Sequence, residues 1–153
     1  MNNMDVGPLD GVGKGLAGAR VLIVEDRAEV ADLLVIAVVD AGGEVIAVAS
    51  TMDSAMELIS SEAISMAIVT KVVRGVHADV LARELVLRGI PYVVTAGTGA
   101  TAGHPELHAA VTITKPFRKR YVQVVLAEIT ARDRSVSFQS PAGGALPGNA
   151  GPA

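Results

Sequence analysis

The chain has 153 residues, of which 50% are hydrophobic, and its formal net charge is -3. A chain of this size can build one domain around one core, and its charge balance gives no electrostatic footprint for nucleic acid. It contains no cysteine, which excludes disulfides and thiolate metal sites. Its apolar runs are too short to cross a bilayer and it begins without a signal-peptide pattern, so we expect a cytoplasmic protein that binds neither nucleic acid nor membrane.

Both ends of the chain are rich in Gly, Pro and Ala and show no hydrophobic periodicity. Segments of this kind cannot bury enough apolar surface to offset the entropy of ordering. We therefore predict a disordered arm over residues 1–18, one folded domain over residues 19–132 and a disordered tail over residues 133–153. No further domain is expected after the folded one.

Five short apolar runs between the two ends predict strands. They are Arg20–Val24, Glu44–Ala49, Met66–Thr70, Tyr92–Ala96 and Val111–Thr114. Each run is continuously hydrophobic, as expected when both faces of a sheet are covered. Helical patterns over residues 28–40, 52–60, 78–88 and 118–132 separate or follow the strands, and Ser50 or Thr51 is placed to cap the second helix. This alternation predicts an α/β fold with a doubly wound, five-stranded parallel sheet of the flavodoxin-like kind.

One segment interrupts the alternation. Residues 95–110 contain three glycines and a proline where a fourth helix belongs. We predict a short or irregular fourth helix, at most one turn near His104 and His108. These two histidines have a spacing that metal ligands use, but without a further ligand cluster we interpret them as solvent-exposed.

Polar side chains follow the predicted strands at their carboxyl ends. Glu25 and Asp26 follow the first strand, Thr70 ends the third, and Lys115 follows the fifth. Ligands of doubly wound sheets bind at this edge. Glu25 and Asp26 offer oxygen ligands to a hard cation, so a weak Mg²⁺ site is one interpretation, and no other cofactor is expected. The alternative is a solvated strand end at which Asp26 starts the helix.

Three features of the sequence belong together, namely the strand followed by Glu25-Asp26, the Lys115-Pro116-Phe117 run and the strand-helix spacing. In these features the chain resembles bacterial response-regulator receiver domains of two-component and phosphorelay signalling. The resemblance covers about residues 20–130, and the segment from Arg74-Gly75 onward looks most like a single-domain alphaproteobacterial subgroup with an Ala-Thr-Gly-Tyr-like run after the fourth strand. It implies two metal-binding acids, a phosphoaccepting aspartate at the end of the third strand, a switch hydroxyl, a switch aromatic residue and a lysine.

The chain departs from that pattern in three respects, the first of which concerns two adjacent residues. Thr70 stands where the phosphoaccepting aspartate is expected, and Lys71 replaces the apolar residue that follows it. Ala96 occupies the position of the switch hydroxyl, and Thr112 occupies that of the aromatic residue. Thr95 lies one residue before Ala96, so we expect its side chain on the opposite face of the sheet. A neutral hydroxyl neither ligates magnesium well nor attacks phosphorus without a base, so the phosphorylation switch is expected to be absent.

These departures favour a pseudo-receiver, a non-enzymatic module that binds a histidine kinase, a phosphotransfer protein or another regulator. The alternative is a response regulator that is phosphorylated on a nonstandard acceptor. A small-molecule sensor is a third hypothesis, although the sequence supplies no aromatic or amide cluster for it. Under the first hypothesis Lys115 has a structural role, in an ion pair with Glu25 or Asp26, and Pro116 favours a cis peptide bond.

Two helices carry candidate contact residues for a partner. The helix over residues 28–40 has more apolar residues than one buried stripe requires, and the surplus consists of Val35, Ile36 and Val39. The last helix carries Tyr121. A helical partner or a second copy of this chain would bind such surfaces.

Overall fold

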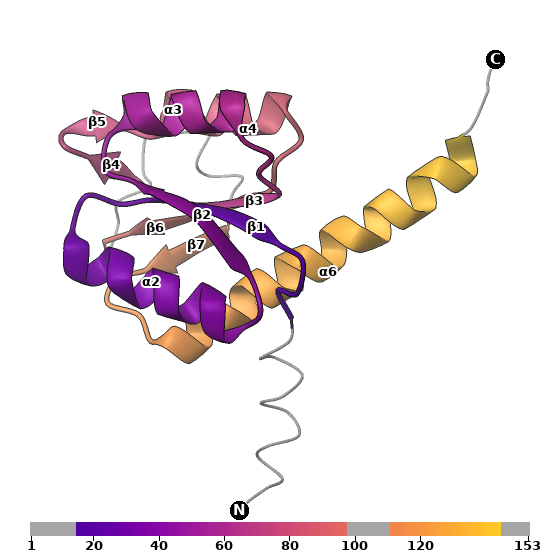
Figure 1. Ribbon diagram of the computed structural model, residues 1–153, viewed down its shortest axis with the longest axis horizontal. Helices are drawn as coiled ribbons and strands as arrows, with labels where there is room; N and C mark the ends of the chain where they lie inside the picture. The colour runs from indigo at the N-terminus through magenta and orange to yellow at the C-terminus, as the bar shows by residue number, and fades with distance from the viewer. Residues whose placement is uncertain (1–14, 98–110, 145–153) are drawn as a thin grey trace, which may run out of the picture.

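A five-stranded parallel sheet forms the centre of the protein. The computed structural model describes residues 15–97 and 111–144, with side chains described up to residue 133. The strands are β1 (Arg20–Val24), β2 (Glu44–Ala49), β3 (Met66–Thr70), β6 (Tyr92–Ala96) and β7 (Val111–Thr114). Their order is β2-β1-β3-β6-β7, the doubly wound arrangement (Figure 1). All five strands have the predicted bounds.

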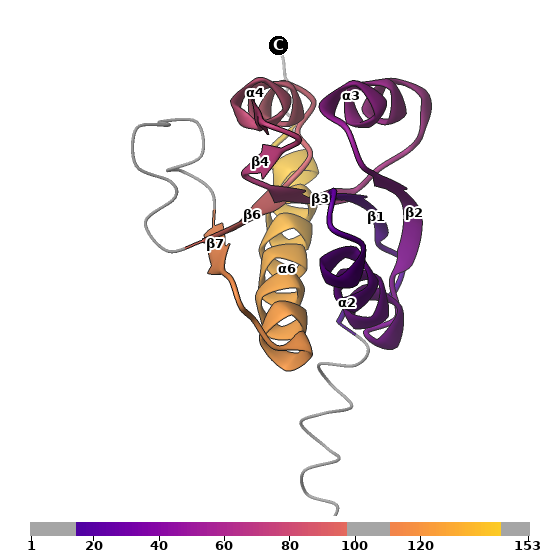
Figure 2. The ribbon, with the colours of Figure 1, turned by 90° about the vertical axis from the view of Figure 1, so that its left-hand side faces the viewer.

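Helices cover both faces of this sheet (Figure 2). One face carries α2 (Ala28–Asp40) and α6 (Lys119–Gly144), and the other carries α3 (Met52–Ser61) and α4 (Asp79–Leu87). Each central strand alternates between two cores, so Ile23 and Ile68 lie under α2 and α6 whereas Val24 and Val69 lie under α3 and α4. This double burial is why the strands are continuously hydrophobic. Among the described residues, no helix is long and apolar enough to cross a membrane.

The predicted cap of the second helix is confirmed. Thr51 is the N-cap of α3, and its hydroxyl accepts a hydrogen bond of 3.1 Å from the Ser54 backbone N–H. The hydroxyl thereby satisfies one of the free N–H groups of the first turn.

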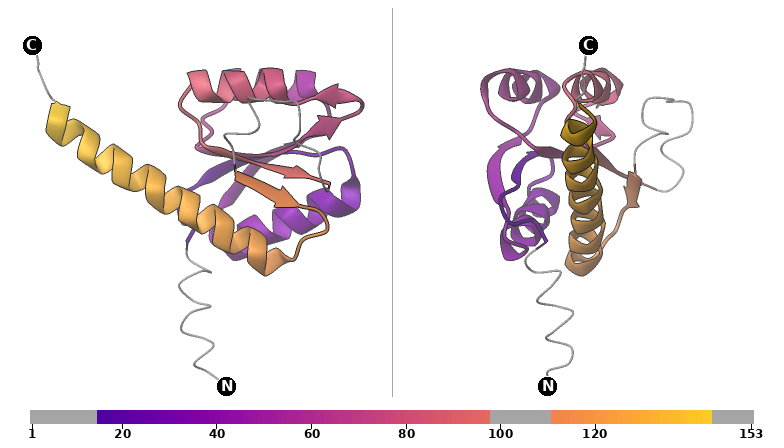
Figure 3. Two further views of the ribbon diagram at one scale, coloured as in Figure 1. Left: turned by 180° about the vertical axis from the view of Figure 1, so that it is seen from behind. Right: turned by 90° about the vertical axis from the view of Figure 1, so that its right-hand side faces the viewer.

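The last helix is longer than predicted. We expected it to end at Arg132, but α6 continues to Gly144 and projects beyond the sheet (Figure 3). The sequence between Arg132 and Pro141 contains neither glycine nor proline, so no residue there stops the helix. The start of the predicted tail at residue 133 is therefore wrong as a boundary of regular structure.

The helix α6 packs on α2 through its first turns. Its core residues are Val122, Val125 and Leu126, whereas Tyr121, the candidate contact residue, is exposed. The Gln123 side-chain amide donates to the carbonyl of Ala37 at 3.1 Å.

The folded domain begins before the predicted residue 19. Leu16 was assigned to the disordered arm, yet its side chain is fully buried in the core under α2 and α6. Its backbone N–H donates to the carbonyl of Ala41 at 3.0 Å. A leucine between glycines gives no periodic signal, so the pattern missed it.

A short hairpin after β3 was not predicted. It pairs β4 (Val72–Val73) with β5 (Val76–His77) in antiparallel fashion around Arg74 and Gly75. Both turn residues have positive φ, 51° for Arg74 and 80° for Gly75, as two-residue hairpin turns of this kind require. The predicted short fourth helix near His104 and His108 lies outside the described residues.

Replacing Leu16 tests whether this residue belongs to the core. Leu16→Ala should lower the free energy of unfolding by about 2–5 kcal/mol, because the truncation leaves a cavity among packed side chains. Urea denaturation of the full chain measures this change. Leu87→Ala is the control, since Leu87 is 75% exposed and its loss should cost less than about 0.5 kcal/mol. Equal costs for the two variants would contradict the assignment.

Candidate functional site

Four polar side chains continue one core layer at the carboxyl edge of the sheet. Glu25 follows Val21 and Ile23 of β1 at every second position, and Thr70 follows Met66 and Ile68 of β3 in the same way. Thr95 follows Val93 of β6, and Lys115 follows Ile113 of β7. Because alternate residues of a strand face the same side, the four side chains converge under the α2 and α6 layer. The apolar residues that precede them on these strands all belong to one core cluster.

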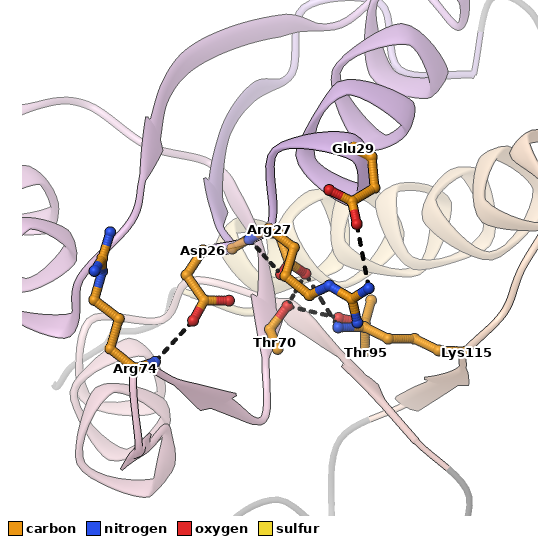
Figure 4. A network of polar contacts seen from close by, with 8 residues as sticks. Asp26, Arg27, Glu29, Thr70, Arg74, Thr95 and Lys115 are labelled. Carbon is orange, nitrogen blue, oxygen red and sulfur yellow. Dashed lines mark hydrogen bonds and ion pairs between the residues drawn. The ribbon is translucent and has the colours of Figure 1, made fainter.

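The Glu25 carboxylate is the centre of this group. Figure 4 shows the side chains of Thr70, Thr95 and Lys115 close together. The Glu25 side chain is fully buried, and one oxygen, Oε1, accepts a short hydrogen bond from the Thr70 hydroxyl. The same oxygen lies 3.2 Å from the Lys115 Nζ, and Oε2 accepts from the Arg27 backbone N–H at 3.1 Å. We call Glu25, Thr70, Thr95 and Lys115 the Glu25 network.

The predicted ion pair of Lys115 is formed with Glu25 and not with Asp26. It joins β7 to β1 across residues far apart in the sequence. The Lys115–Pro116 peptide bond is cis, as expected. Buried carboxylates require such a partner, because an unpaired charge in the core carries a large desolvation penalty.

Thr95 belongs to the network, which corrects our prediction that it faces away. Its hydroxyl oxygen lies 3.0 Å from that of Thr70, and the two residues are partners in the β3–β6 ladder. Partners in a parallel ladder face the same side of the sheet. Ala96 is buried in the opposite core under α3 and α4, and Thr112 is partly buried on β7.

Asp26 anchors the β4–β5 turn instead of starting a helix or pairing with Lys115. Its Oδ2 accepts a hydrogen bond of 2.9 Å from the Arg74 backbone N–H. The N-cap of α2 is Arg27, whose side chain forms no cap, so the capping role predicted for Asp26 is wrong. Glu25 is buried, so the alternative of a solvated strand end is wrong for this residue. The hydrogen bond from Arg74 lowers the pKa of the Asp26 carboxyl below its usual value of 3.8.

The two carboxylates that we predicted as weak metal ligands make different contacts. Glu25 faces the network, and Asp26 faces the hairpin turn. In the part of the chain that the structure describes, no three His, Cys, Asp or Glu side chains gather in a way that could hold a metal ion.

Sequence reasoning missed three cationic residues beside the network. Arg27, Lys71 and Arg74 line the same pocket as Thr70 and Thr95. Lys71 directly follows β3, and Arg74 reaches the pocket only because the hairpin folds back. The pairing of Val72-Val73 with Val76 around a glycine was the one local signal that could have indicated this turn.

The candidate partner residues divide between exposed and buried positions. Ile36 and Val39 of α2 are exposed, as expected, but Val35 is partly buried against the core and is not free for a partner. Tyr121 is exposed and lines a groove with Pro116, Phe117 and Val124. That groove lies between the end of β7 and the first turns of α6.

The solved structures that this chain resembles include response regulators and their receiver domains. The response regulator PhyR from Brucella abortus matches with a TM-score of 0.72 and 19% identity, over 91% of this chain and 60% of PhyR. A CheY-like receiver domain protein from Methanospirillum hungatei matches with a TM-score of 0.68 and 21% identity, over 76% of this chain and 97% of its own. The anti-anti-sigma factor PhyR of Bartonella quintana, as a double mutant, matches with a TM-score of 0.71 and 18% identity, over 86% of this chain and 55% of its own.

These likenesses establish the receiver fold. The chain spans little more than half the length of the two PhyR proteins that it matches. No family model matches the sequence. No curated protein matches it either.

Breaking the Lys115–Glu25 ion pair should destabilise the fold. Lys115→Met leaves the buried carboxylate without its cation and should cost about 3 kcal/mol of unfolding free energy. Adding Glu25→Gln removes the stranded charge and should recover part of that loss. Urea denaturation of the native chain, Lys115→Met, Glu25→Gln and the double variant gives the coupling energy between the two residues. Lys119→Met, which breaks an exposed pair with Asp40, is the control and should cost less than about 1 kcal/mol. Equal losses for Lys115→Met and Lys119→Met would contradict the central role of Glu25.

The lowered pKa of Asp26 predicts a pH dependence. A carboxyl whose pKa is lower in the folded state stabilises the fold above its unfolded pKa, and this contribution is lost as pH falls through the folded pKa. The stability difference between the native chain and Asp26→Asn should therefore be constant above about pH 5 and shrink below pH 3.8. We expect this stability difference to be less than about 1 kcal/mol, since the Asp26 side chain is partly exposed. Denaturation curves at several pH values measure it, and a difference that grows on acidification would refute the assignment.

Proposed function

We propose that this protein is a pseudo-receiver, a non-enzymatic signalling module of a two-component or phosphorelay pathway that acts by binding another protein. It does so without phosphorylation of an aspartate. The receiver fold supports the pathway, and the chemistry of the Glu25 network supports the absence of phosphorylation.

The observation that carries this proposal is the hydroxyl of Thr70. In the resembled family this position holds a carboxylate that ligates magnesium and attacks the phosphoryl group. Here a neutral group, only 6% exposed, donates its hydrogen to Glu25 and lies against Thr95. Such a side chain supplies neither the negative charge that a divalent cation requires nor an accessible nucleophile.

The partner that we propose is a histidine kinase, a phosphotransfer protein or another regulator. Exposed Ile36 and Val39 on α2 and the Tyr121 groove of α6 supply apolar surface for a helical partner or for a second copy of this chain. With a fixed network in place of a switch, the protein would act by occupying its partner, as a competitor, scaffold or adaptor.

A threonine-phosphorylated regulator is the second candidate function. It is favoured by one observation, the hydrogen bond from Thr70 to Glu25, because a carboxylate in that position is a general base for the hydroxyl. Both carboxylate oxygens, however, already accept bonds from Lys115 and the Arg27 backbone. We therefore rank this function second.

Intact mass spectrometry after incubation with acetyl phosphate and Mg²⁺ tests the proposal. The native chain should gain no mass, because Thr70 is buried and uncharged. Thr70→Asp should gain one phosphoryl group, since it restores a carboxylate beside Glu25 and Lys115. Thr70→Asn is the matched control, because its side chain has the same shape as aspartate but no charge, and it should gain none.

If the native chain does gain a covalent phosphate, the stability of that phosphate to hydroxylamine would show which residue carries it. A hydroxylamine-labile phosphate would be an acyl phosphate and would overturn the pseudo-receiver proposal. A hydroxylamine-stable phosphate that disappears in Thr70→Ala would instead establish the second candidate.

A further inference from the structure

Two surfaces of the protein combine exposed apolar side chains with charges of opposite sign. One is the outer face of α2, and the other is the Tyr121 groove between the end of β7 and the first turns of α6. The helix α2 contains three acidic residues and no Lys or Arg, whereas the chain enters α6 through Arg118-Lys119-Arg120. Negative and positive charges are therefore segregated between two helices that pack on one another.

The outer face of α2 presents a stripe of side chains at helical spacing. We call Asp32, Ile36 and Val39 the α2 stripe, because positions i, i+4 and i+7 lie on one face of a helix. About half of the surface of Ile36 and of Val39 is exposed. Asp32 is exposed too, and among the described residues its carboxylate has no ion-pair partner. Anchors at this spacing are typical of a helix that binds in an apolar groove of another protein.

The Tyr121 groove has the complementary composition. It has a volume of about 690 Å³, and its apolar lining consists of Pro116, Phe117, Tyr121 and Val124. Its charged lining is Arg118 and Arg120, and none of the described residues that line it is acidic. Both arginines are exposed, and within residues 15–97 and 111–133 neither has an ion-pair partner. The groove thus suits an apolar ligand that also carries a carboxylate.

The stripe and the groove lie on different sides of α6 in one copy of the protein. Figure 2 shows α6 between α2 and β7, and the groove is on the β7 side. On the α2 side, Lys119 pairs with Asp40 at 2.8 Å, so the same charge complementarity is already used within the copy. An α2 stripe can therefore reach the groove only from a second copy.

We infer that copies of this protein associate head to tail, with the α2 stripe of one copy in the Tyr121 groove of the next. The two apolar residues of the stripe pack on the apolar lining of the groove, and Asp32 pairs with Arg118 or Arg120. Since two different surfaces meet, the contact is heterologous and leaves one stripe and one groove free at the ends of an open assembly. A contact of this size is weak, with a dissociation constant of about 10 µM to 1 mM.

This inference deepens the proposed function by naming a second copy as a partner of the α2 and α6 surfaces, and it rests on that function only in this respect. Association covers the surfaces that another regulator would bind. The protein concentration would then set, by mass action, how many copies are free to bind that regulator.

Sedimentation velocity of the full chain at several concentrations tests the inference. Between about 10 µM and 1 mM, the weight-average mass should rise above the monomer mass of 15.6 kDa. The rise should be smaller in about 1 M NaCl, because salt screens ion pairs at exposed positions. A chain that stays monomeric over the whole range would overturn the inference.

Charge-reversal variants show whether both surfaces take part. Asp32→Arg and the double variant Arg118→Asp/Arg120→Asp should each weaken self-association by at least about tenfold. Glu57→Arg is the matched control, since it makes the same change of charge at an exposed position of α3, on the opposite face of the sheet. It should change the association constant by less than about twofold. Equal weakening by Asp32→Arg and Glu57→Arg would contradict the role of the α2 stripe.

A mixture of the two weakened variants tests the head-to-tail arrangement. Asp32→Arg keeps an intact groove, and Arg118→Asp/Arg120→Asp keeps an intact stripe. The mixture should associate although neither variant does so alone, and recovery in the mixture also shows that both variants are folded. A mixture that remains monomeric would refute the pairing of stripe with groove.

Intact mass spectra after incubation with acetyl phosphate and Mg²⁺ separate this inference from the proposed function. A monomeric chain that gains no phosphoryl group would refute only the self-association. A self-associating chain that carries an acyl phosphate would refute only the pseudo-receiver.

Discussion

The buried charge of Glu25 is the constraint on which the carboxyl edge of the sheet depends. A carboxylate with a fully buried side chain must be surrounded by donors, and these come from separate parts of the chain. Thr70 contributes from β3, Lys115 from the end of β7, and the Arg27 N–H from the start of α2. The position of one charge thus fixes three elements relative to β1, and Thr95 of β6 joins them through Thr70.

Features that depend on burial alone could be predicted from the sequence. The five strands are bounded where their continuous apolar runs end, and the pairing of Lys115 with Glu25 follows from two strands that end at one edge. The side chain of Thr95 was placed on the wrong face because Ala96, one residue later, was assigned to the face of the site. Its pairing with Thr70 in the ladder decides the orientation, and strand register is not visible in a local pattern.

Other features depend on tertiary contacts that leave no local signal. Leu16 lies among glycines, and only its contact with the α2 layer makes it a core residue. Lys71 is buried between the end of β3 and the start of the β4–β5 hairpin, although a charged side chain gives no local signal of burial. Relative to the resembled family, Thr70 removes a negative charge and Lys71 adds a positive one.

The two threonine hydroxyls have a further consequence, because each carries a single hydrogen. The carboxylate of Glu25 can only accept, so the hydrogen of Thr70 points to Glu25. The Thr70 oxygen must then accept the hydrogen of Thr95. The chain of hydrogen bonds consequently has one direction, from β6 through β3 to β1, and each bond polarises the next. The acceptor oxygens of Glu25, directly after β1, thereby set the orientation of a dipole two strands away, next to the carbonyl that holds the backbone of Lys71.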